Sequence, residues 1–454
     1  MALMEDVVAL CKRRGFIFPG SDIYGGLSNT WDYGPYGSQL KKNIMDFWWK
    51  TFVENRDDMI GLDSGILMNP RVWEASGHVA NFADPLMDCK KCNERVRADK
   101  LVEEKTGENV DGKPDEEIFN IVMDNKLVCP ACGELDWTMP RAFNLMFKTY
   151  QGVIEEEAEQ IFLRPETAQG IFVNFKNILD SSRVRLPFGV GQVGKGFRNE
   201  ITPGNFIYRT REFEMMEIEY FVRSDQVDEY FEQWVKASKD FFVAIGVREE
   251  HLRVRQHDPD ELSHYSTKTV DLEYQFPFGW GELQGIAHRG DYDLSQHIKY
   301  SGARLEYRDP VTNEVFVPHV IEPSWGLTRA LLTVLLDAYE EEELPDGEKR
   351  TVMHFDPKIA PVQIAVFPLT NKLDEEARKV YEALKKFFRC EFDTSGAIGK
   401  RYRRQDEIGT PFCVTFDFDS LEDGAVTVRD RDSMEQERVK MKELEEYFNS
   451  KLVH

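Results

Sequence analysis

Hydrophobic positions along the chain repeat with different periods, and the changes of period divide it into parts. Apolar residues between Ser38 and Asn55 recur at helical spacing, which predicts an amphipathic helix. A strand-like segment from Met59 to Met68 follows, and Asn69-Pro70 ends it. Farther on, apolar and charged residues alternate in Ile218–Val222 and Val270–Phe278. This alternation is typical of an antiparallel sheet with one solvated or ligand-facing side.

The C-terminal part alternates strand and helix signals. Gln363–Phe367 is a continuous apolar run, as expected of a buried parallel strand. Further helix and strand patterns follow: a helix over Leu373–Phe388, strands over Phe412–Phe416 and Ala425–Val428, and a charged helix over Met434–Phe448. This order predicts a small α/β domain over residues 355–454.

Two further changes in residue composition mark the other boundaries. The acidic run Glu340–Glu343, followed by Pro345-Asp346-Gly347, ends an apolar helix and indicates a first domain over residues 1–345. Within it, residues 86–150 resemble an insertion that contains two Cys-x-x-Cys pairs. The middle of this insertion, Glu103–Glu117, is acidic and contains glycine, so a solvated loop is expected there.

The paired cysteines predict a metal site. Cys89 and Cys92, with Cys129 and Cys132, have the two-knuckle spacing of a Cys₄ zinc ribbon. Four thiolates would fill every tetrahedral position, so the zinc would be structural. Four reduced thiols without metal are the alternative. The N-terminus lacks the pattern of a secretion signal, which argues against a disulfide framework and predicts a cytoplasmic location.

Composition narrows the possible partners. No apolar run approaches the roughly 20 residues that span a bilayer, so no membrane segment is expected. The net charge of −24 disfavours a general nucleic-acid binder, because phosphate neutralisation needs lysine and arginine. Lys400, Arg401, Arg403 and Arg404, however, surround Tyr402 in a local basic patch. An acidic body with one basic patch restricts where a polyanion can bind.

Three segments carry the residues for activating a carboxylic acid with ATP. They are Phe197–Glu200, Arg209–Phe213 and Glu322–Arg329. The acid attacks the α-phosphorus and pyrophosphate leaves, so fixed cations and metal must meet the growing charge. The planar fork of Arg198 can bridge the α-phosphate and the substrate carboxylate. Arg209 and Arg329 are candidates for the terminal phosphates and Phe213 for the adenine ring. Glu282 is the candidate for magnesium, with Glu200 and Glu322 as alternatives.

These segments resemble the three signature motifs of class II aminoacyl-tRNA synthetases. Ser38–Pro70 is similar to motif 1, Phe197–Glu200 with Arg209–Phe213 to motif 2, and Ser324–Arg329 to motif 3. Within the class, the chain is similar from end to end to the dimeric glycyl-tRNA synthetases. The matches that carry this resemblance are Trp31–Pro35, Arg164–Gly170, Gly281–Ala287, Glu322–Ser324 and Arg404–Thr410. Ser324 replaces the usual glycine of motif 3, and the glycyl family shares this serine as a substrate contact.

The resemblance implies an α+β catalytic domain built on an antiparallel sheet, with a zinc-ribbon-like insertion and a C-terminal α/β anticodon-binding domain. It implies ATP with Mg²⁺, glycine and tRNA(Gly) as ligands, and a homodimer formed through motif 1. Arg198, Glu200 and Arg329 would be catalytic. Lys400, Arg401, Arg403 and Arg404 are the candidate contacts to tRNA.

Two sets of binding residues follow from the matching motifs. The ATP site would contain Arg198, Asn199, Glu200, Tyr208, Arg209, Thr210, Arg211, Glu212, Phe213, Glu282, Leu283, Gly326, Leu327, Thr328 and Arg329. The glycine site would contain Arg97, Glu166, Phe213, Glu214, Met215, Met216, Glu217, Glu322, Pro323, Ser324, Trp325 and Gly326. Among these, Glu166, Glu217 and Glu322 can surround an ammonium group.

Two alternative functions remain. A catalytically silent relative would serve as an accessory or regulatory binding module, but such proteins are expected to lose motif residues that this chain keeps. A threonyl, prolyl or histidyl enzyme of the same subclass would lack Glu322-Pro323-Ser324. The sequence therefore favours ATP-dependent ligation of glycine to tRNA through glycyl-adenylate.

Overall fold

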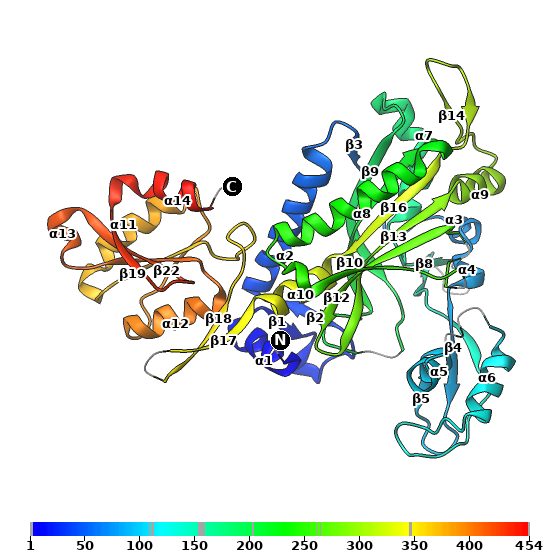
Figure 1. Cartoon of the computed structure of the whole chain (residues 1–454), viewed down its shortest axis with the longest axis horizontal. Helices are drawn as coiled ribbons and strands as arrows, with labels where there is room; N and C mark the ends of the chain where they lie inside the picture. The colour runs from blue at the N-terminus through cyan, green and yellow to red at the C-terminus, as the bar shows by residue number, and fades with distance from the viewer. Residues whose placement is uncertain are drawn as a thin grey trace.

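The computed structural model describes residues 3–108, 110, 113–152, 159–201, 204–259, 261–263, 265–344 and 347–452. Figure 1 shows a large sheet with helices packed on it, a small unit that projects from one end, and a separate domain at the C-terminal end. None of the helices in the described ranges combines the length and apolar character that crossing a membrane requires.

The first part contains most of the elements. Its helices are α1 (Met4–Arg14), α2 (Pro35–Trp49), α3 (Pro70–Ala75), α4 (His78–Asn81), α7 (Ala168–Ser182), α8 (Val227–Ala244), α9 (Tyr292–Ser301) and α10 (Leu327–Ala338). Its strands are β1 (Ile17–Pro19), β2 (Trp31–Tyr33), β3 (Met59–Gly61), β7 (Lys148–Gln151), β8 (Glu159–Phe162), β9 (Phe188–Phe197), β10 (Glu212–Val222), β11 (Leu252–Gln256), β12 (Lys268–Phe276), β13 (Gly279–Gly290), β14 (Tyr307–Arg308), β15 (Val315–Phe316), β16 (His319–Gly326), β17 (Tyr339–Glu343) and β18 (Lys349–Met353).

The central sheet has the order β11-β12-β13-β16-β10-β9-β3. Neighbouring strands are antiparallel except at the edge, where β3 runs parallel to β9. The predicted antiparallel sheet is confirmed, since Ile218–Val222 lies in β10 and most of Val270–Phe278 in β12. Long antiparallel strands place side chains from distant parts of the sequence on one shared surface.

One face of this sheet is covered by α2, α8 and α10 and forms the main core (Figure 1). Met216, Ile218 and Tyr220 of β10 are fully buried in it. Trp325 of β16 lies 5.5 Å from the ring of Trp48 and 5.0 Å from that of Phe52. Because successive strand residues alternate between faces, the intervening residues of β10 and β16 point to the opposite side.

The N-terminal prediction needs one correction. The predicted helix is found as α2, which begins at Pro35 and continues as a π-helical turn over Lys50–Glu54. Proline suits the first helical position because a backbone N–H at that position has no acceptor within the helix, so nothing is lost when proline lacks it. The strand predicted over Met59–Met68 is limited to β3, since only Met59–Gly61 pairs with β9.

The inserted unit contains β4 (Ala83–Asp88), β5 (Arg95–Arg97), α5 (Ala98–Thr106), α6 (Asp115–Asp124) and β6 (Arg141–Asn144). The solvated loop predicted over Glu103–Glu117 is wrong at both ends, where α5 and α6 extend into it. Residues 109, 111 and 112 lie outside the described ranges. Asp115, Glu116 and Glu117 occupy the first turn of α6, where negative charge favours a helix.

The acidic run Glu340–Glu343 lies in strand β17 rather than in a loop. It pairs antiparallel with β18, and Glu342 accepts a hydrogen bond from the buried Arg350 at 2.8 Å. Pro345 and Asp346 lie outside the described residues. This ribbon leads from α10 into the C-terminal domain (Figure 1).

The C-terminal domain contains β19 (Ile364–Pro368), α11 (Asp374–Leu384), β20 (Cys390–Phe392), α12 (Ile398–Ile408), β21 (Phe412–Phe416), α13 (Ser420–Asp423), β22 (Ala425–Asp430), β23 (Gln436–Lys440) and α14 (Leu444–Leu452). Its sheet has the order β20-β19-β21-β22-β23, with β19 parallel to both of its neighbours. The charged helix predicted over Met434–Phe448 is wrong in its first half, which forms β23 because it pairs along β22.

The C-terminal domain contacts the first part through polar groups. Asn43 of α2 donates to the carbonyl oxygens of Ile359 and Ala360 at 2.9 and 3.0 Å. Arg13 of α1 pairs with Glu407 of α12 at 3.1 Å. These bonds hold the segment that precedes β19, and α12, against the first part.

Two helical glycines give a matched test of the packing. A Cβ at Gly37 in α2 would overlap the carbonyl oxygen of Phe16, whereas a Cβ at Gly399 in α12 would meet open space. Gly37→Ala should lower the thermal unfolding midpoint because backbone must move. Gly399→Ala should leave it unchanged or raise it, since alanine gains about 0.5–1 kcal/mol over glycine in a helix. Equal midpoints for both variants would contradict the packing of α2 on Phe16.

Candidate active site

A cleft with a volume of about 570 Å³ lies on the sheet face opposite the main core. It is lined by residues of β10, β12, β13 and β16, by the start of α10, and by the segment between β9 and β10. The walls are rich in charge: they include the arginines Arg198, Arg209 and Arg329 as well as several carboxylates. Such a cleft suits a ligand that carries both phosphate and ammonium groups.

The cleft brings together most of the predicted site residues. From the predicted ATP set it is lined by Arg198, Glu200, Tyr208, Arg209, Thr210, Phe213, Glu282, Gly326, Thr328 and Arg329. From the predicted glycine set it is lined by Glu166, Phe213, Glu214, Met215, Glu217, Glu322, Ser324 and Gly326. The two sets meet at Phe213 and Gly326, so ATP and an amino acid would lie side by side.

Several predicted residues lie elsewhere, which corrects the expectation of side-chain contacts for them. Met216, Leu283, Trp325 and Leu327 belong to the main core on the other face. Arg211 donates to the carbonyl oxygens of Glu200 and Ser28, and Glu212 pairs with Lys195. Asn199 and Pro323 are also absent from the described lining. For Met216, Leu283 and Trp325 the physical reason is the strand period of two, which turns these side chains to the core face.

Arg97, predicted in the glycine site, belongs to the insertion. Its guanidinium pairs with Asp84 at 3.1 Å and with Asp99 at 2.5 Å, and it does not line the described cleft. Both carboxylates belong to the inserted unit, so the charge of Arg97 is paired within that unit.

Arg198 lies near two aromatic rings. The centre of its guanidinium lies 5.3 Å from the ring centroids of both Phe82 and Phe213, and its Nε donates to the carbonyl oxygen of Pro165 at 3.1 Å. The two cation–π contacts and the hydrogen bond together restrain the planar fork. Phe213 is therefore a contact of Arg198, in addition to being the predicted face for adenine.

Arg329 and Glu282 form the opposite edge of the cleft. Arg329 donates to a carboxylate oxygen of Glu282 at 3.0 Å and to the carbonyl oxygen of Tyr208 at 3.3 Å, with Tyr208's ring centroid 4.6 Å away. The guanidinium lowers the pKa of Glu282. Burial and the nearby Glu282 raise the pKa of Asp271, on the adjacent strand, to about 6.

The floor of the cleft is acidic. Glu217 accepts from the Thr167 N–H at 3.0 Å, from the Thr167 hydroxyl and from the Ser324 hydroxyl at 2.9 Å. Glu322 accepts from Arg289 at 2.6 Å. Burial raises the pKa of Glu322 well above its usual range, although Arg289 opposes this.

Glu166 completes this floor. Burial alone would raise the pKa of Glu166, but the neighbouring His78 and Arg289 outweigh it and lower that pKa. The Nε2 atom of His78 lies 3.4 Å from the carboxylate. The floor therefore combines an ionised acid with acids that hold a proton more tightly.

Sequence reasoning missed several residues of the site. Arg289 lies two positions beyond the Gly281–Ala287 motif, so the strand period of β13 was a signal that could have found it. His78 and Phe82 come from the short helix α4 and the residue after it, and no periodic pattern marks them. Their contribution depends on tertiary packing.

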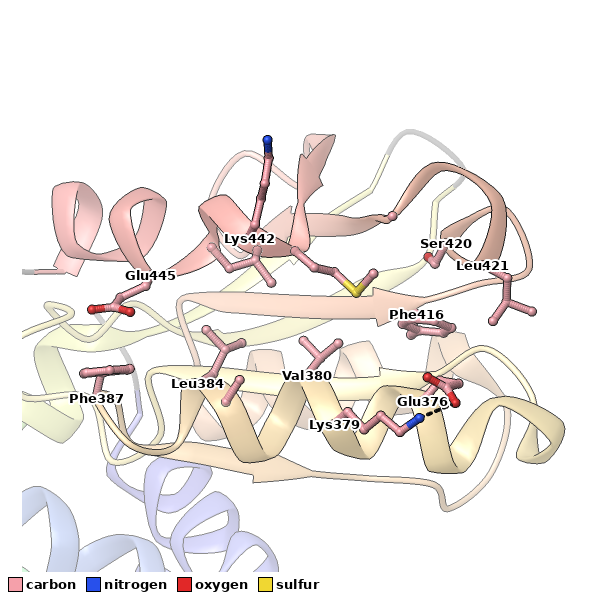
Figure 2. A pocket seen from close by; sticks show the side chains of 14 residues that line it. Glu376, Lys379, Val380, Leu384, Phe387, Phe416, Ser420, Leu421, Lys442 and Glu445 are labelled. Carbon is pink, nitrogen blue, oxygen red and sulfur yellow. Dashed lines mark hydrogen bonds and ion pairs between the residues drawn. The ribbon is translucent and has the colours of Figure 1, made fainter.

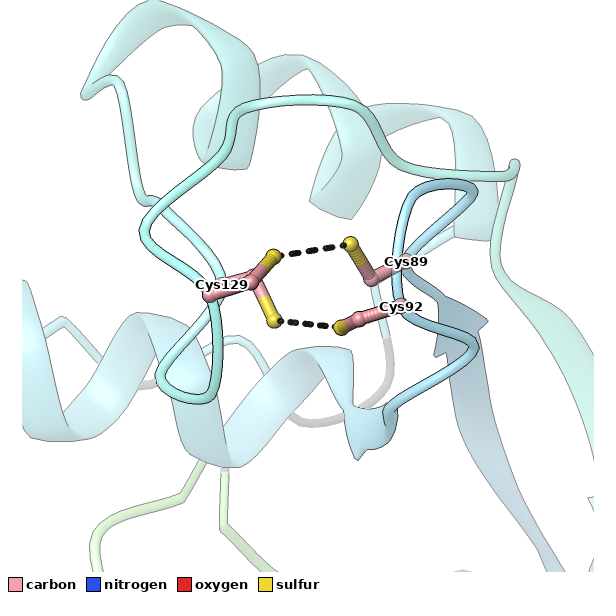
Figure 3. A group of neighbouring side chains, drawn as sticks. Cys89, Cys92 and Cys129 are labelled. Carbon is pink, nitrogen blue, oxygen red and sulfur yellow. Dashed lines mark hydrogen bonds between the residues drawn. The ribbon is translucent and has the colours of Figure 1, made fainter.

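The four predicted metal ligands lie together in the insertion (Figure 3). Sγ atoms of Cys89 and Cys132, and of Cys92 and Cys129, are 3.6 Å apart, and all four lie within 4.8 Å of one another. Both knuckles have the same turn, closed by Asn93 N–H to Cys89 and Gly133 N–H to Cys129 at 2.8 Å. Such spacings suit a tetrahedral ion with Zn–S bonds of about 2.3 Å.

The basic patch of α12 needs a correction. Arg401 is only 3% exposed, and its guanidinium donates to the carbonyl oxygens of Pro368, Thr394 and Gly396. It therefore ties the loop before α12 to the sheet and is unavailable to tRNA. Lys400 is exposed, while Arg403 and Arg404 are partly exposed beside Asp406 and Asp393.

A second hollow of about 490 Å³ lies in the C-terminal domain between α11 and α14 (Figure 2). Val380, Leu384, Phe387 and Phe416 give it an apolar lining. Lys379 and Lys442 are the cationic side chains among the described residues around it, and the arginine cluster of the large-sheet cleft has no counterpart there. The chemistry therefore belongs to the charged cleft on the large sheet.

Comparison with known proteins agrees with this division. Residues 147–339 match the family described as "tRNA synthetase class II core domain (G, H, P, S and T)". Residues 363–451 match the family described as "Anticodon binding domain". The first match contains β10, β12, β13 and β16, which line the cleft, and the second covers the C-terminal sheet.

Full-length relatives identify the group more closely. A glycine–tRNA ligase of Geobacillus thermodenitrificans is 56% identical over 456 residues, covering 99% of this chain and 98% of the relative. One of Acetivibrio thermocellus is 57% identical over 453 residues with the same coverage. Identity at this level over nearly the whole length shows that the chain belongs to the glycine–tRNA ligase family of class II synthetases.

Proposed function

We propose that the protein ligates glycine to tRNA(Gly) at the expense of ATP, through a glycyl-adenylate intermediate. The observation that carries this proposal is the cleft in which Arg198, Arg329 and Glu282 lie beside the acidic pair Glu217 and Glu322. The first group fits a nucleoside triphosphate, and the second fits the ammonium of an amino acid.

In the first step, a carboxylate oxygen of glycine attacks the α-phosphorus, and the bond to pyrophosphate breaks. Arg198, with its fork restrained by Phe82 and Phe213, would bridge the attacking carboxylate and the α-phosphate. Arg209 and Arg329 would meet the charge that moves onto pyrophosphate. In the second step, a hydroxyl of the terminal adenosine of tRNA attacks the glycyl carbonyl, its proton passes to a phosphate oxygen, and the bond to AMP breaks.

Magnesium would be held by Glu282. Its carboxylate is about half exposed at the cleft edge, and Arg329 pairs with one of its oxygens, so a hard oxygen ligand faces the phosphate end. The ion would neutralise phosphate charge when bound. Glu200 is 9% exposed and lines the same cleft, and its backbone carbonyl oxygen accepts from Arg211 at 3.1 Å.

Glycine selection would rest on charge and exclusion. Glu166, Glu217 and Glu322 would face the ammonium, and Ser324, bonded to Glu217, would lie against the α-carbon. A larger amino acid must place its side chain into packed protein, and overpacking costs about 1–3 kcal/mol even for one methylene. Rejecting a larger competitor needs no separate editing domain.

The remaining proposals concern organisation. Residues 1–345 would form the catalytic domain, with the insertion over 86–150 as a zinc ribbon held by Cys89, Cys92, Cys129 and Cys132. Residues 355–454 would bind the anticodon arm, with Lys400, Arg403 and Arg404 as contacts. The protein would act in the cytoplasm as a homodimer joined through the motif 1 helix and strand.

A silent binding module is the weaker alternative. Its cleft would not need Arg198, Glu282 and Arg329 at phosphate-binding positions, yet all three line it here. Relatives named glycine–tRNA ligase also match over nearly the whole chain.

Activation chemistry is tested by ATP–pyrophosphate exchange with each of the twenty amino acids, without tRNA. Exchange is expected with glycine alone. Arg198→Ala and Arg198→Lys should both lower it by at least about 100-fold, because lysine lacks the planar fork. Arg223→Lys, at a surface arginine paired with Glu314 outside the cleft, is the matched control and should retain most activity. Silence with all twenty amino acids and no tRNA charging would support the binding module instead.

The tRNA surface is tested by replacing Lys400, Arg403 and Arg404 with alanine together. The KM for tRNA should rise and its salt dependence should flatten, because fewer phosphates are neutralised. Glycine-dependent exchange should remain intact. Lys236→Ala, on α8, is the control for loss of an exposed charge. An equal fall in exchange would contradict the assignment.

Zinc is tested by metal analysis of the purified chain and of Cys132→Ser. The native chain should hold equimolar zinc, and the variant should lose it and unfold its insertion at lower temperature, since a structural site supplies folding energy. Exchange should persist because the cysteines lie outside the cleft. Cys390→Ser, a half-buried thiol of β20, should keep the zinc. Metal-free native protein with the same unfolding profile would disprove the site.

A further inference from the structure

One carboxyl group beneath the cleft has no assigned role. Glu219 of β10 lies two residues beyond Glu217 on the same face of the sheet. It is fully buried, and neither of its oxygens has a hydrogen-bond partner in the structure. An isolated carboxylate in such a place costs several kcal/mol, so the group must be neutral or must meet a positive charge.

Its surroundings supply mostly negative charge. Oxygens of Glu217, Glu219 and Glu322 lie within 4.8 Å of one another. From β13, Arg289 is the one cation near Glu219 in the described surroundings, and it is shared with Asp293 of α9 through bonds of 2.7 and 2.9 Å. On the other side, β9 presents the apolar Val190 opposite Glu219.

The acids farther out are already paired. Glu166 lies near His78 and Arg289, and Tyr265 stacks on the Arg289 guanidinium at 3.9 Å. Arg289 and His78 therefore pair directly with this group of five buried acids, Glu166, Glu217, Glu219, Glu322 and Asp293. Arg164 lies near Glu217 but donates to the carbonyl oxygens of Ser64 and Lys195, and His297 lies near Asp293 but bonds to Gln169. This imbalance requires a further positive charge in the empty site.

Hydrogen bonds decide which acid carries the proton. Glu217 accepts from Thr167 and Ser324, and Glu322 accepts from Arg289, and such bonds favour the ionised form. Glu219 accepts none. Burial, and then the charge of Glu322, raise the pKa of Glu219 well above its usual range. A carboxyl group turns easily about its terminal bond, so the proton can face either neighbour.

We propose that Glu219 holds a proton while the ammonium subsite is empty and releases it to solvent when the ammonium of glycine enters. This inference rests on the proposed function of the cleft. One positive charge replaces another, so the acidic floor keeps its charge balance in both states. Glu219 is thus a positioning residue that sets the charge of the subsite, beneath the groups that touch glycine.

The sign of the pH effect follows from linkage. The proton is bound more tightly in the empty site than beside an ammonium. Glycine binding therefore releases a proton in the pH range between the two pKa values of Glu219, and affinity rises with pH across that range, by up to about tenfold per pH unit. A neutral amide at this position cannot take part in the exchange.

The experiment compares the native chain with Glu219→Gln by the glycine KM in pyrophosphate exchange from pH 6 to pH 8.5. The ratio of the two KM values cancels the titration of glycine, ATP and pyrophosphate. The two values should agree at low pH, where Glu219 is protonated, and differ by about tenfold or more at high pH, where it ionises on binding. The KM for ATP should be unchanged.

Calorimetry supplies the second readout. Glycine binding with an unreactive ATP analogue, measured in buffers of different ionisation enthalpy, should release protons from the native chain and fewer from Glu219→Gln. Glu273→Gln is the matched control, because Glu273 is a buried acid of β12 paired with Arg253 and Arg255 outside the cleft. Its KM ratio to the native chain should not change with pH.

Each result is decisive. A KM ratio for Glu219→Gln that is constant with pH, at one or at any other value, would overturn proton exchange. The same holds for equal proton release in both proteins. A native chain with no glycine-dependent exchange at any pH would instead contradict the proposed function, so the two failures are distinguishable.

Discussion

The buried guanidinium of Arg289 is the interaction on which the acidic side of the sheet depends. Its side chain is 1% exposed, yet it joins Asp293 of α9 by two bonds and Glu322 of β16 by a third at 2.6 Å. Removing a charge of this kind while its partners stay buried costs about 3–5 kcal/mol. Because Arg289 is on β13, one residue fixes two adjacent strands and a helix around the floor of the cleft.

The same strands build the main core on their other face. Glu217 and Glu219 alternate along β10 with Met216 and Ile218, which are fully buried against α2, α8 and α10. The apolar face gives the sheet its stability, and the stability lets the opposite face hold several acids close together. The site is rigid because its side chains stand on strands, while Arg198 and Arg209 come from the segment that crosses the cleft.

The sequence predicts correctly those strands and site residues for which the hydrophobic period and the motifs agree. Strand β21 followed from its strand pattern and most of β12 from the alternation of apolar and charged residues, and Arg198, Glu217 and Arg329 followed from their motifs. Sequence reasoning failed where tertiary contacts outweigh the local sequence pattern. Residues 436–440 have the pattern of a charged helix but form a strand that pairs with β22. Arg401 lies in a basic stretch of the sequence, but its guanidinium donates to buried carbonyl groups.

Within contiguous motif segments, sequence reasoning could not separate the residues that face the cleft from those that face the core. Met216 and Trp325 lie beside site residues in the chain, and the strand period turns them to the other side. His78 and Glu219 were missed for a different reason. An isolated histidine and an acid in a strand carry no signal until the fold shows what surrounds them.

Glycine offers a protein only two charges and a small size, and this limit explains the excess of acid in the cleft. An ammonium must be bound by charge, yet carboxyl groups that are close enough to surround it repel one another when it is absent. Arg289 resolves part of this conflict from the edge of the floor, where it bonds Glu322 and leaves Glu217 facing the cleft. A second arginine in the centre would occupy the place of the substrate. A proton on a buried acid takes up no such space, so it is the compensating charge that an ammonium subsite can keep and then give up.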